Sequence, residues 1–173
     1  RGVVIAKNEL FSAQINEEDH LRLCVLSPGL NVSKCWQRIN EIDNEIAEKL
    51  AYSFDIKYGY LTACPTNLGT GIRVSVMMHL PALKMTDQLK KLFESARDMN
   101  LAVRGLFGEG TEAVGDFFQI SNQVTLGVSE QKIVDDFQNL IIPKIVEYER
   151  IARDKLLTGE INILDDKIAR ALA

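Results

Sequence analysis

The sequence lacks the features that mark membrane-spanning, secreted and nucleic-acid-binding proteins. No apolar run approaches the roughly 18 residues that cross a bilayer, and no basic segment leads into an apolar one as in a secretory signal. Basic residues are not in excess, because the net charge is −4, whereas nucleic acids and anionic membranes are bound by basic surfaces. We therefore expect a cytoplasmic protein that binds neither nucleic acid nor membrane and whose anion sites are local.

Cysteine and histidine are also scarce, which narrows the chemistry available. The three cysteines, Cys24, Cys35 and Cys64, are odd in number and lack CxxC spacing, so neither a disulfide framework nor a zinc site is indicated. The two histidines, His20 and His79, have no recognisable arrangement with Cys64, which argues against a Cys/His hydrolase. We expect free thiols in a reducing compartment, with Cys24 and Cys35 in packing roles.

Length and composition favour a single globular domain with a sizeable core. The chain has 173 residues, of which 46% are apolar and 25% are charged, as is ordinary for globular proteins. It begins with Arg1 rather than Met, and we therefore expect residues 1–173 to be one domain of a longer protein.

Apolar periodicity predicts strands and helices in an order that lacks regular βαβ alternation. Alternate apolar positions over residues 11–15 and 21–25 flank polar residues 16–20, which predicts a hairpin with an acidic tip. The order of elements favours an α+β fold, in which an antiparallel β-sheet is flanked by α-helices. The other predicted elements are helices over residues 31–54, from Thr86 to Met99 and from Ser129 to about Lys155 with a break at Pro143, and strands over residues 58–63, 72–80, 101–107 and 117–123.

The acidic tip is the first of three loops whose residues suit chemistry. In "NEEDHLR", residues 16–22, the adjacent carboxylates Glu17, Glu18 and Asp19 precede Arg22. A charge run of this kind is most often a solvated turn, and spacing alone favours that interpretation. The functional alternative is that Arg22 holds a phosphate while a neighbouring carboxylate accepts a proton or orients a nucleophile.

The second loop, "CPTNLGTGIR" at residues 64–73, combines a thiol, glycines and an arginine. Gly69 and Gly71 allow a ligand to approach the backbone closely. Arg73 can make a forked contact with an anion, although the GxxxxGK[ST] order of a Walker motif is absent and connections of this kind are common without a ligand. Cys64 is either a reactive thiolate in a cationic, hydroxyl-lined setting or an inert thiol of the core.

The third loop, "RGLFGEGTE" at residues 104–112, is either a flexible flap or an ordinary glycine-rich turn. Considered together, Arg22, Arg73 and Arg104 each lie at a strand edge beside a carboxylate or a thiol, in a protein that is otherwise acidic. Phosphoryl transfer needs such a set, because guanidinium groups and a metal ion neutralise the negative charge that spreads over oxygens in the transition state.

The three loops, in this order, resemble the signature segments of the ATP:guanido phosphotransferases, a family that includes creatine kinase, arginine kinase and the bacterial protein-arginine kinase. The similarity covers residues 3–155, and its third segment is "RGLFGEGTEAVGDFFQISN". The stretch "LTACPTNLGTGIRVSVMMHLPAL" is most similar to the protein-arginine kinase branch, since the small-molecule kinases usually have a histidine where Met77 stands. The resemblance implies the fold shared by guanido kinases and the glutamine synthetase catalytic domain, an antiparallel sheet flanked by helices.

The resemblance also implies a role for each loop. A protonated guanidinium is a poor nucleophile, so anions must orient it and receive a proton as the N–P bond forms. In this sequence, Glu18 would hold the guanidinium and accept its proton, Cys64 as a thiolate would tune the attacking nitrogen, and Glu109 would grip the other side. Mg²⁺ would bridge the ATP phosphates without a dedicated cage of protein ligands. The residues that would clamp those phosphates are Arg22, Arg73 and Arg104.

The implied function is ATP-dependent phosphorylation of arginine residues in proteins. Two alternatives stay open: a phosphagen kinase that acts on free arginine, and a non-catalytic module that binds arginine-bearing or phosphoarginine-bearing partners. Members of the protein-arginine kinase branch act in the bacterial stress response with a clamp-and-protease system, and a homo-oligomer is compatible with the sequence. Family enzymes carry further phosphate-binding arginines upstream, so we expect residues 1–173 alone to bind nucleotide weakly.

Overall fold

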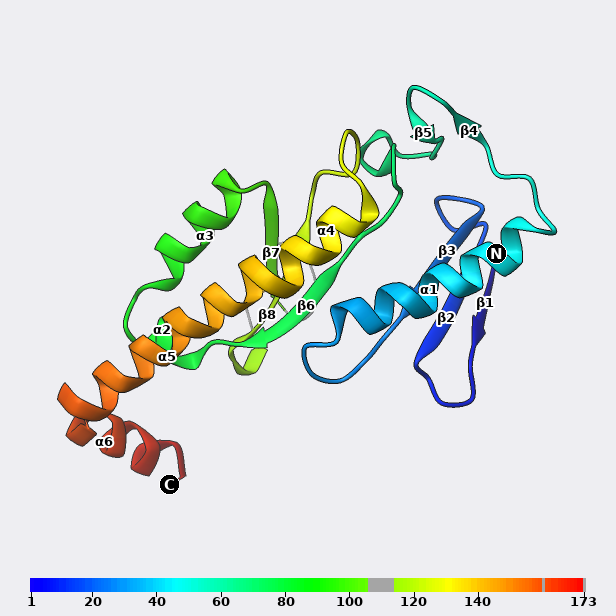
Figure 1. The fold of residues 1–173 in the computed structure, drawn as a ribbon. Helices are drawn as coiled ribbons and strands as arrows, with labels where there is room; N and C mark the ends of the chain where they lie inside the picture. Colours follow the sequence, from blue (N-terminus) through cyan, green and yellow to red (C-terminus); the bar gives the residue numbers. More distant parts are fainter. Residues whose placement is uncertain (106–113, 160, 173) are drawn as a thin grey trace. The chain divides into compact units, whose positions relative to one another are not determined.

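The structure, a computed structural model, describes residues 1–105, 114–159 and 161–172. The chain divides into two compact units, each with its own strands and helices (Figure 1). The first unit comprises Arg1–Val74 and Asn122–Leu140, and the second comprises Ser75–Ser121 and Ile141–Ala173.

The first unit begins with a three-stranded antiparallel sheet. Its strands are β1 (Gly2–Ile5), β2 (Phe11–Ile15) and β3 (Leu21–Val25), in the order β1-β2-β3. Strands β2 and β3 pair from Phe11 opposite Val25 to Ile15 opposite Leu21, so residues 16–20 form the turn. The predicted hairpin with an acidic tip is therefore confirmed. Alternation had not predicted β1, whose four residues are all exposed.

Helix α1 (Val32–Ala47) contacts β3 and ends seven residues before the predicted boundary at residue 54. The Tyr52 hydroxyl donates a 2.9 Å hydrogen bond to Asp43 Oδ1. In a continuous helix, residues nine apart lie on opposite faces, so this contact requires the chain to leave the helix and turn back. Burial and then the bond to Asp43 raise the pKa of Tyr52, which keeps the hydroxyl a donor. Leu50, which fits the helical spacing, is 52% exposed.

A short hairpin follows in place of the strand predicted over residues 58–63. Only β4 (Phe54–Asp55) and β5 (Gly59–Tyr60) pair, and Asp55 Oδ1 accepts from the N–H groups of Lys57 and Tyr58 to close the turn. The pairing continues by one bond, from Leu61 N–H to the Ser53 carbonyl at 2.9 Å, whereas the Ala63 N–H donates to the Asp19 side chain, so residue 63 does not extend the ladder. The predicted strand is wrong except for its two β5 residues.

The second unit contains a second three-stranded sheet. Its strands are β6 (Ser75–His79), β7 (Leu101–Gly105) and β8 (Phe117–Asn122), in the order β6-β8-β7. Strands β6 and β8 are antiparallel, with Ser75 opposite Ser121 and His79 opposite Phe117. The three strands predicted here are confirmed, β6 and β8 with narrower bounds, while residues 106–107 of the third lie outside the described residues. The largest fully buried apolar side chains of this unit are Leu80, Leu83, Ile120 and Ile142.

Two short helices join β6 to β7, and the sequence predicted only the second. Helix α2 (Pro81–Met85) starts with a proline, whose missing N–H costs nothing in a first turn, and α3 (Leu89–Asp98) packs against β7. Thr86 was predicted to start α3, and this is wrong. Its hydroxyl donates to the Ala82 carbonyl, so Thr86 terminates α2 instead.

The C-terminal third is helical, with an interruption where proline requires one. Helix α4 (Glu130–Asp136) is capped by Ser129, whose hydroxyl accepts from Lys132 N–H as predicted. A π-helical turn (Phe137–Ile141) then precedes α5 (Ile142–Gly159), so Pro143 falls in the first turn of a new helix. Helix α5 extends past the predicted end, and α6 (Ile161–Leu172) follows it.

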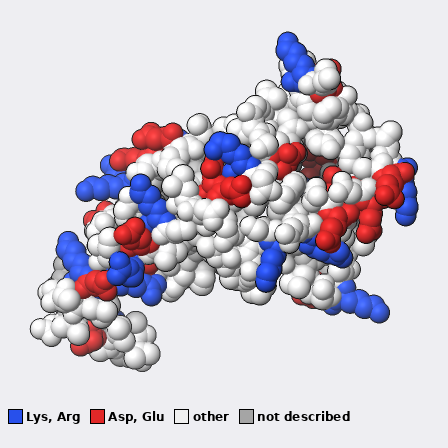
Figure 2. All heavy atoms as spheres, in the orientation of Figure 1, with Lys and Arg blue, Asp and Glu red and all other residues white. Residues whose placement is uncertain are grey.

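Two features of the structure correspond to the composition of the sequence: the distribution of charge on the surface and the apolar content of the helices. Acidic and basic side chains are interspersed on the face drawn in Figure 2. Within the described part of the chain, no helix is both long and apolar enough to cross a membrane.

Glu149 on α5 is the acid that joins this helix to α2. Its side chain is buried, and its two carboxylate oxygens accept from the N–H groups of Ala82 and Leu83 at 3.1 and 3.0 Å. Arg153, one helical turn on, donates to the same carboxylate at 2.7 Å. The carboxylate therefore caps α2 from another element, since α2 has no capping side chain of its own.

We predict that Glu149→Ala lowers the free energy of unfolding by about 2–4 kcal/mol, because two buried N–H groups and one guanidinium lose their acceptor. Glu149→Gln, which retains one carbonyl acceptor, should lose less. The control is Asp154→Ala on the same helix, which breaks an exposed pair with Arg150 and should change stability by less than about 1 kcal/mol. Urea titration measures all three, and equal losses for Glu149→Ala and Asp154→Ala would contradict the capping role.

Candidate functional site

The three acids of the turn between β2 and β3 have different environments. The turn is closed by a 3.0 Å bond from Asn16 N–H to the His20 carbonyl. Glu17 lies 3.7 Å from Arg22, with both side chains about half exposed. Glu18 is exposed and has no hydrogen bond or ion pair to any residue that the structure describes. Asp19 is half-buried and accepts hydrogen bonds from another loop. The interpretation of a purely solvated turn therefore fails for Asp19.

That other loop is residues 64–73, which we call the thiol loop. Cys64 precedes a 3₁₀ turn, Pro65–Asn67, in which Asn67 N–H donates to the Cys64 carbonyl at 3.0 Å. The Cys64 sulfur lies 2.9 Å from the Thr66 hydroxyl. Cys64 is half-buried, so it is not a thiol of the closed core. A hydroxyl at this distance can donate to a thiolate, which fits the reactive alternative.

Asp19 brings the acidic turn and the thiol loop together. Its Oδ1 accepts from Ala63 N–H at 2.6 Å, and its Oδ2 accepts from the Asn67 side-chain amide at 3.5 Å. Because Glu18 and Asp19 are adjacent, this contact sets the backbone of Glu18 beside the turn that carries Cys64.

The other cysteines take no part in this arrangement. Cys35 on α1 is half-buried, and burial raises the pKa of its thiol, with the neighbouring Cys24 raising it further. A thiol that stays protonated fits the packing role expected for Cys35. Cys24 on β3 is exposed, so the packing role expected for it is wrong. It follows Arg22 and Leu23 on a strand that exposes alternate residues.

Thr125 forms hydrogen bonds with the middle of the thiol loop. The Thr125 hydroxyl lies 3.0 and 2.7 Å from the carbonyls of Thr66 and Leu68, and the Thr125 carbonyl accepts from Thr70 N–H at 2.9 Å. Gly69 has φ +107°, and an added Cβ would lie 2.3 Å from the Thr125 carbonyl oxygen. Gly69 is therefore required by the close approach of two backbones.

Asn122 secures the end of the same loop. It is buried, its Oδ1 accepts from Val74 N–H at 2.7 Å, and its amide donates to the Ile72 carbonyl at 3.1 Å. Gly71 (φ +63°) lies between the two anchors, and an added Cβ would meet no atom closer than Asn67 O at 3.9 Å. Gly71 is thus the glycine of this loop that leaves space beside the backbone.

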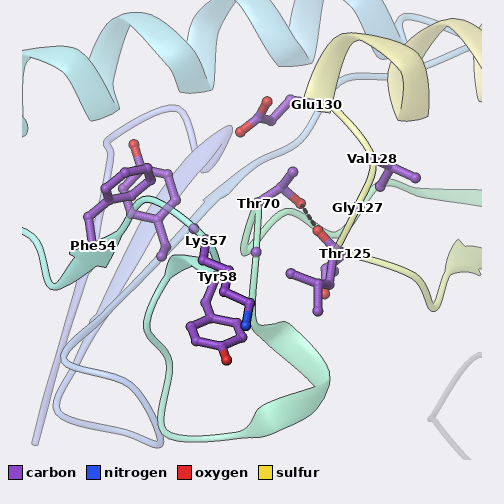
Figure 3. A pocket seen from close by; sticks show the side chains of 12 residues that line it. Phe54, Lys57, Tyr58, Thr70, Thr125, Gly127, Val128 and Glu130 are labelled. Carbon is purple, nitrogen blue, oxygen red and sulfur yellow. Dashed lines mark hydrogen bonds between the residues drawn. The ribbon is translucent and has the colours of Figure 1, made fainter.

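A pocket of about 230 Å³ lies beside Gly69 and Thr70 of the thiol loop (Figure 3). It is lined by residues of the segments 54–60, 69–70 and 125–130, with Lys57 and Glu130 reaching it from different segments. The dashed bond in Figure 3 joins Thr70 to Thr125. Of the predicted site residues that the structure describes, Glu18, Arg22, Cys64, Arg73 and Arg104, none lines this pocket, so these residues would carry out their predicted chemistry elsewhere.

The remaining predicted residues are distributed as follows. Arg22 on β3 shares the acidic hairpin, and Arg73 is exposed at the end of the thiol loop. Arg104 is half-buried on β7 and belongs to the second unit. Glu109 lies outside the described residues. The structure therefore places Asp19, the neighbour of Glu18, against the segment that carries Cys64, with Arg22 on the same hairpin as Glu18.

Sequence reasoning missed the residues that hold the loops. Asp19 was grouped with the other acids, while Asn122 and Thr125 were given no role. The hydroxyls of Thr66 and Thr70 contact Cys64 and Thr125. The signal for Thr125 was weak, because a threonine after a strand gives no indication of a partner 57 residues away.

We predict that Thr125→Val destabilises the fold by about 1–3 kcal/mol, because the new methyl group cannot donate to the Thr66 and Leu68 carbonyls. Thr125→Ser retains the hydroxyl and should lose much less. Thr158→Val is the control, since that hydroxyl donates only within its own exposed helix turn and should change stability by under about 0.5 kcal/mol. Urea titration is the measurement, and wild-type stability in Thr125→Val would refute the anchoring role.

Known proteins resemble this chain in sequence over nearly its whole length. It is 48% identical over 169 residues to the protein-arginine kinase of Shouchella clausii, a match that covers 98% of this chain and 47% of that protein. It is 46% identical over 170 residues to the protein-arginine kinase of Bacillus subtilis, covering 98% and 47% respectively. The chain thus spans about half the length of these relatives.

Solved structures have the same fold, which confirms the predicted α+β arrangement of antiparallel strands with helices. The duplicated taurocyamine kinase of Schistosoma mansoni, with bound transition state analogue components, is 35% identical with a TM-score of 0.79, covering 87% of this chain and 20% of that one. A lombricine kinase is 33% identical with a TM-score of 0.77, covering 86% and 41%.

The match to a family model agrees with the sequence relatives and with the solved structures. Residues 1–152 match the sequence model of the ATP:guanido phosphotransferase C-terminal catalytic domain. This span includes the acidic turn, the thiol loop and the sequence segment 104–112. The chain therefore belongs to the ATP:guanido phosphotransferase family.

Proposed function

We propose that this chain is the catalytic domain of a kinase that transfers the γ-phosphoryl group of ATP to the guanidinium group of arginine residues in proteins. The observation that carries the proposal is the contact of Asp19 with the thiol loop, because it sets Glu18 and Cys64, the two groups suited to a guanidinium, on adjacent backbone segments. Relatives named protein-arginine kinase, at 46–48% identity, support the choice of substrate class.

The residues of the first unit suit the activation of a guanidinium. Glu18 is exposed and has no partner among the described residues, so its carboxylate can accept two N–H bonds from an arriving guanidinium. As the nitrogen forms its bond to phosphorus, the bond from phosphorus to the β,γ-bridging oxygen breaks and ADP leaves. The proton released by the nitrogen passes to Glu18. Cys64, with Thr66 beside its sulfur, contacts a second guanidinium nitrogen and fixes its direction.

The three arginines are proposed to hold the nucleotide. Membership of the family implies the use of ATP, and Arg22, Arg73 and Arg104 supply guanidinium forks that match phosphate oxygens. Glu109 is proposed to contact the other side of the substrate. Mg²⁺ would supply charge neutralisation between phosphates. In the described ranges, no three His, Cys, Asp or Glu side chains form a group suited to a metal ion, so the phosphates themselves would hold it.

The proposal extends to the longer protein. We infer a cytoplasmic enzyme that modifies proteins in the bacterial stress response, works with a clamp-and-protease system and assembles as a homo-oligomer. Residues 1–173 alone are expected to bind nucleotide weakly, because family enzymes have further phosphate-binding arginines upstream.

We predict that Glu18→Gln and Cys64→Ala, made in the full-length enzyme, each reduce phosphoarginine formation on a protein substrate by about 10²-fold or more. The glutamine cannot accept the proton, and the alanine cannot contact the guanidinium. Glu41→Gln on α1 is the matched control, because Glu41 is an exposed acid whose partner is Arg38 on the same helix, and it should retain activity. Mass spectrometry of phosphoarginine measures transfer, and undiminished transfer in both site variants would rule out their roles.

Free arginine distinguishes the proposed function from its nearest alternative. We predict that kcat/KM is higher for arginine in a protein than for the free amino acid, because the relatives named protein-arginine kinase are more similar in sequence than the taurocyamine and lombricine kinases. A preference for free arginine would favour a phosphagen kinase. Binding of Mg·ATP with no phosphoarginine and no ADP above background would instead favour a non-catalytic module.

A further inference from the structure

Asp19 differs from the two acids that precede it, and the difference is one of contacts. Glu17 and Glu18 are exposed, whereas Asp19 is half-buried. Glu17 faces Arg22 within its own hairpin, but both oxygens of Asp19 face a loop more than forty residues away in sequence. A half-buried carboxylate whose two oxygens already accept hydrogen bonds from a distant loop has fewer lone pairs left for a substrate.

The two bonds of Asp19 are made on either side of Cys64. Oδ1 accepts from the N–H of Ala63, the residue before the cysteine, and Oδ2 accepts from the side chain of Asn67, three residues after it. Asn67 N–H in turn donates to the Cys64 carbonyl at 3.0 Å. One carboxylate therefore spans both ends of the 3₁₀ turn that carries the thiol.

We propose that Asp19 is a positioning residue, which fixes the separation of Glu18 and Cys64 by bonding the thiol loop to the acidic turn. This inference rests on the proposed function, because it assigns the purpose of the contact to guanidinium alignment. A bidentate contact at this point constrains both position and rotation of the loop. Displacement of a catalytic group by about 1 Å can cost about 10²-fold in rate, so a contact that holds two groups in register has a large effect without touching substrate.

The alternative is that Asp19 acts through its negative charge on the guanidinium or on the thiol. Two substitutions separate geometry from charge. Asp19→Asn has the same size and retains Oδ1 as an acceptor for Ala63 N–H, while the Asn67 amide can rotate to accept from the new NH₂ group. Asp19→Glu keeps the charge but adds a methylene group, which displaces the carboxylate or the loop. Asp19→Ala removes both features.

The test uses these three variants in the full-length enzyme with two independent measurements. The first is the rate at which iodoacetamide alkylates Cys64, read by peptide mass spectrometry with Cys24 and Cys35 as internal references. The second is kcat and KM for phosphoarginine formation on a protein substrate. Asp55→Ala is the matched control, because Asp55 is also half-buried and also accepts backbone N–H groups, but it does so in the β4–β5 turn.

We expect Asp19→Ala and Asp19→Glu to raise Cys64 alkylation about tenfold, the factor that follows from losing one hydrogen bond to a charged group. They should lower kcat by about 10²-fold while KM for ATP stays constant. Asp19→Asn should remain within about threefold of wild type in both measurements, since a single altered hydrogen bond of this kind is worth less than one factor of ten. Asp55→Ala should change neither. The references Cys24 and Cys35 should react at wild-type rates in every variant.

Two outcomes would overturn the proposal: wild-type alkylation of Cys64 in Asp19→Ala, or a loss of kcat in Asp19→Asn as large as that in Asp19→Ala, which would assign the effect to charge. The alkylation measurement does not need kinase activity. If the wild-type enzyme made no phosphoarginine, the proposed function would fail, while altered Cys64 alkylation in Asp19→Ala with recovery in Asp19→Asn would still support the contact.

Discussion

The thiol loop has little regular secondary structure, so the hydrogen bonds of its backbone must come from side chains and backbone elsewhere in the first unit. Buried or half-buried backbone groups without partners cost free energy, and a loop beside a core cannot rely on water for all of them. Asp19, Asn122 and Thr125 supply these partners at the beginning, the end and the middle of the loop respectively. The loop therefore has one conformation because three separate side chains determine it.

These anchors explain how a loop can have the rigidity that phosphoryl transfer needs. Alignment and charge neutralisation provide most of the rate enhancement in this chemistry, so the groups that align the reactants must not move independently. Gly69 allows the loop backbone to approach Thr125 more closely than any side chain would permit. Gly71 lies between the anchored parts with open space beside it. The two glycines thus have different reasons: Gly69 allows the close approach of two backbones, and Gly71 adopts a φ of +63° that L side chains rarely take.

The sequence predicted the elements whose signal is local. Alternation identified the β2–β3 hairpin, an apolar run identified the strand β6, and the hydroxyl of Ser129 marked the start of α4, because a cap bonds within its own first turn. Predictions failed where a distant contact decided the outcome. After α1 ends, Tyr52 bonds back to Asp43, and α2 has a cap supplied by Glu149 from a helix more than sixty residues later.

In the candidate site, too, residues in short motifs could be predicted, whereas residues that act through distant contacts could not. The chemistry-bearing residues Glu18 and Cys64 could be named from short motifs, since a motif records which side chains are present. The residues that position them could not, because nothing in "NEEDHLR" indicates that the third acid faces Ala63 while the second faces solvent. The roles of all the predicted site residues remain predictions; Glu109 in addition lies outside the described residues, and Arg104 lies in the second unit.

The three neighbouring acids of the turn between β2 and β3 differ in what their carboxylates contact. A carboxylate already bonded to a guanidinium or to backbone N–H groups has fewer lone pairs for a new cation, as with Glu17 beside Arg22 and Asp19 beside Ala63. Glu18 is solvated, so an arriving guanidinium displaces only water from it and breaks no protein contact. Since the neighbours of Glu18 are already engaged, Glu18 is the acid of this turn that the proposed function leaves for a guanidinium.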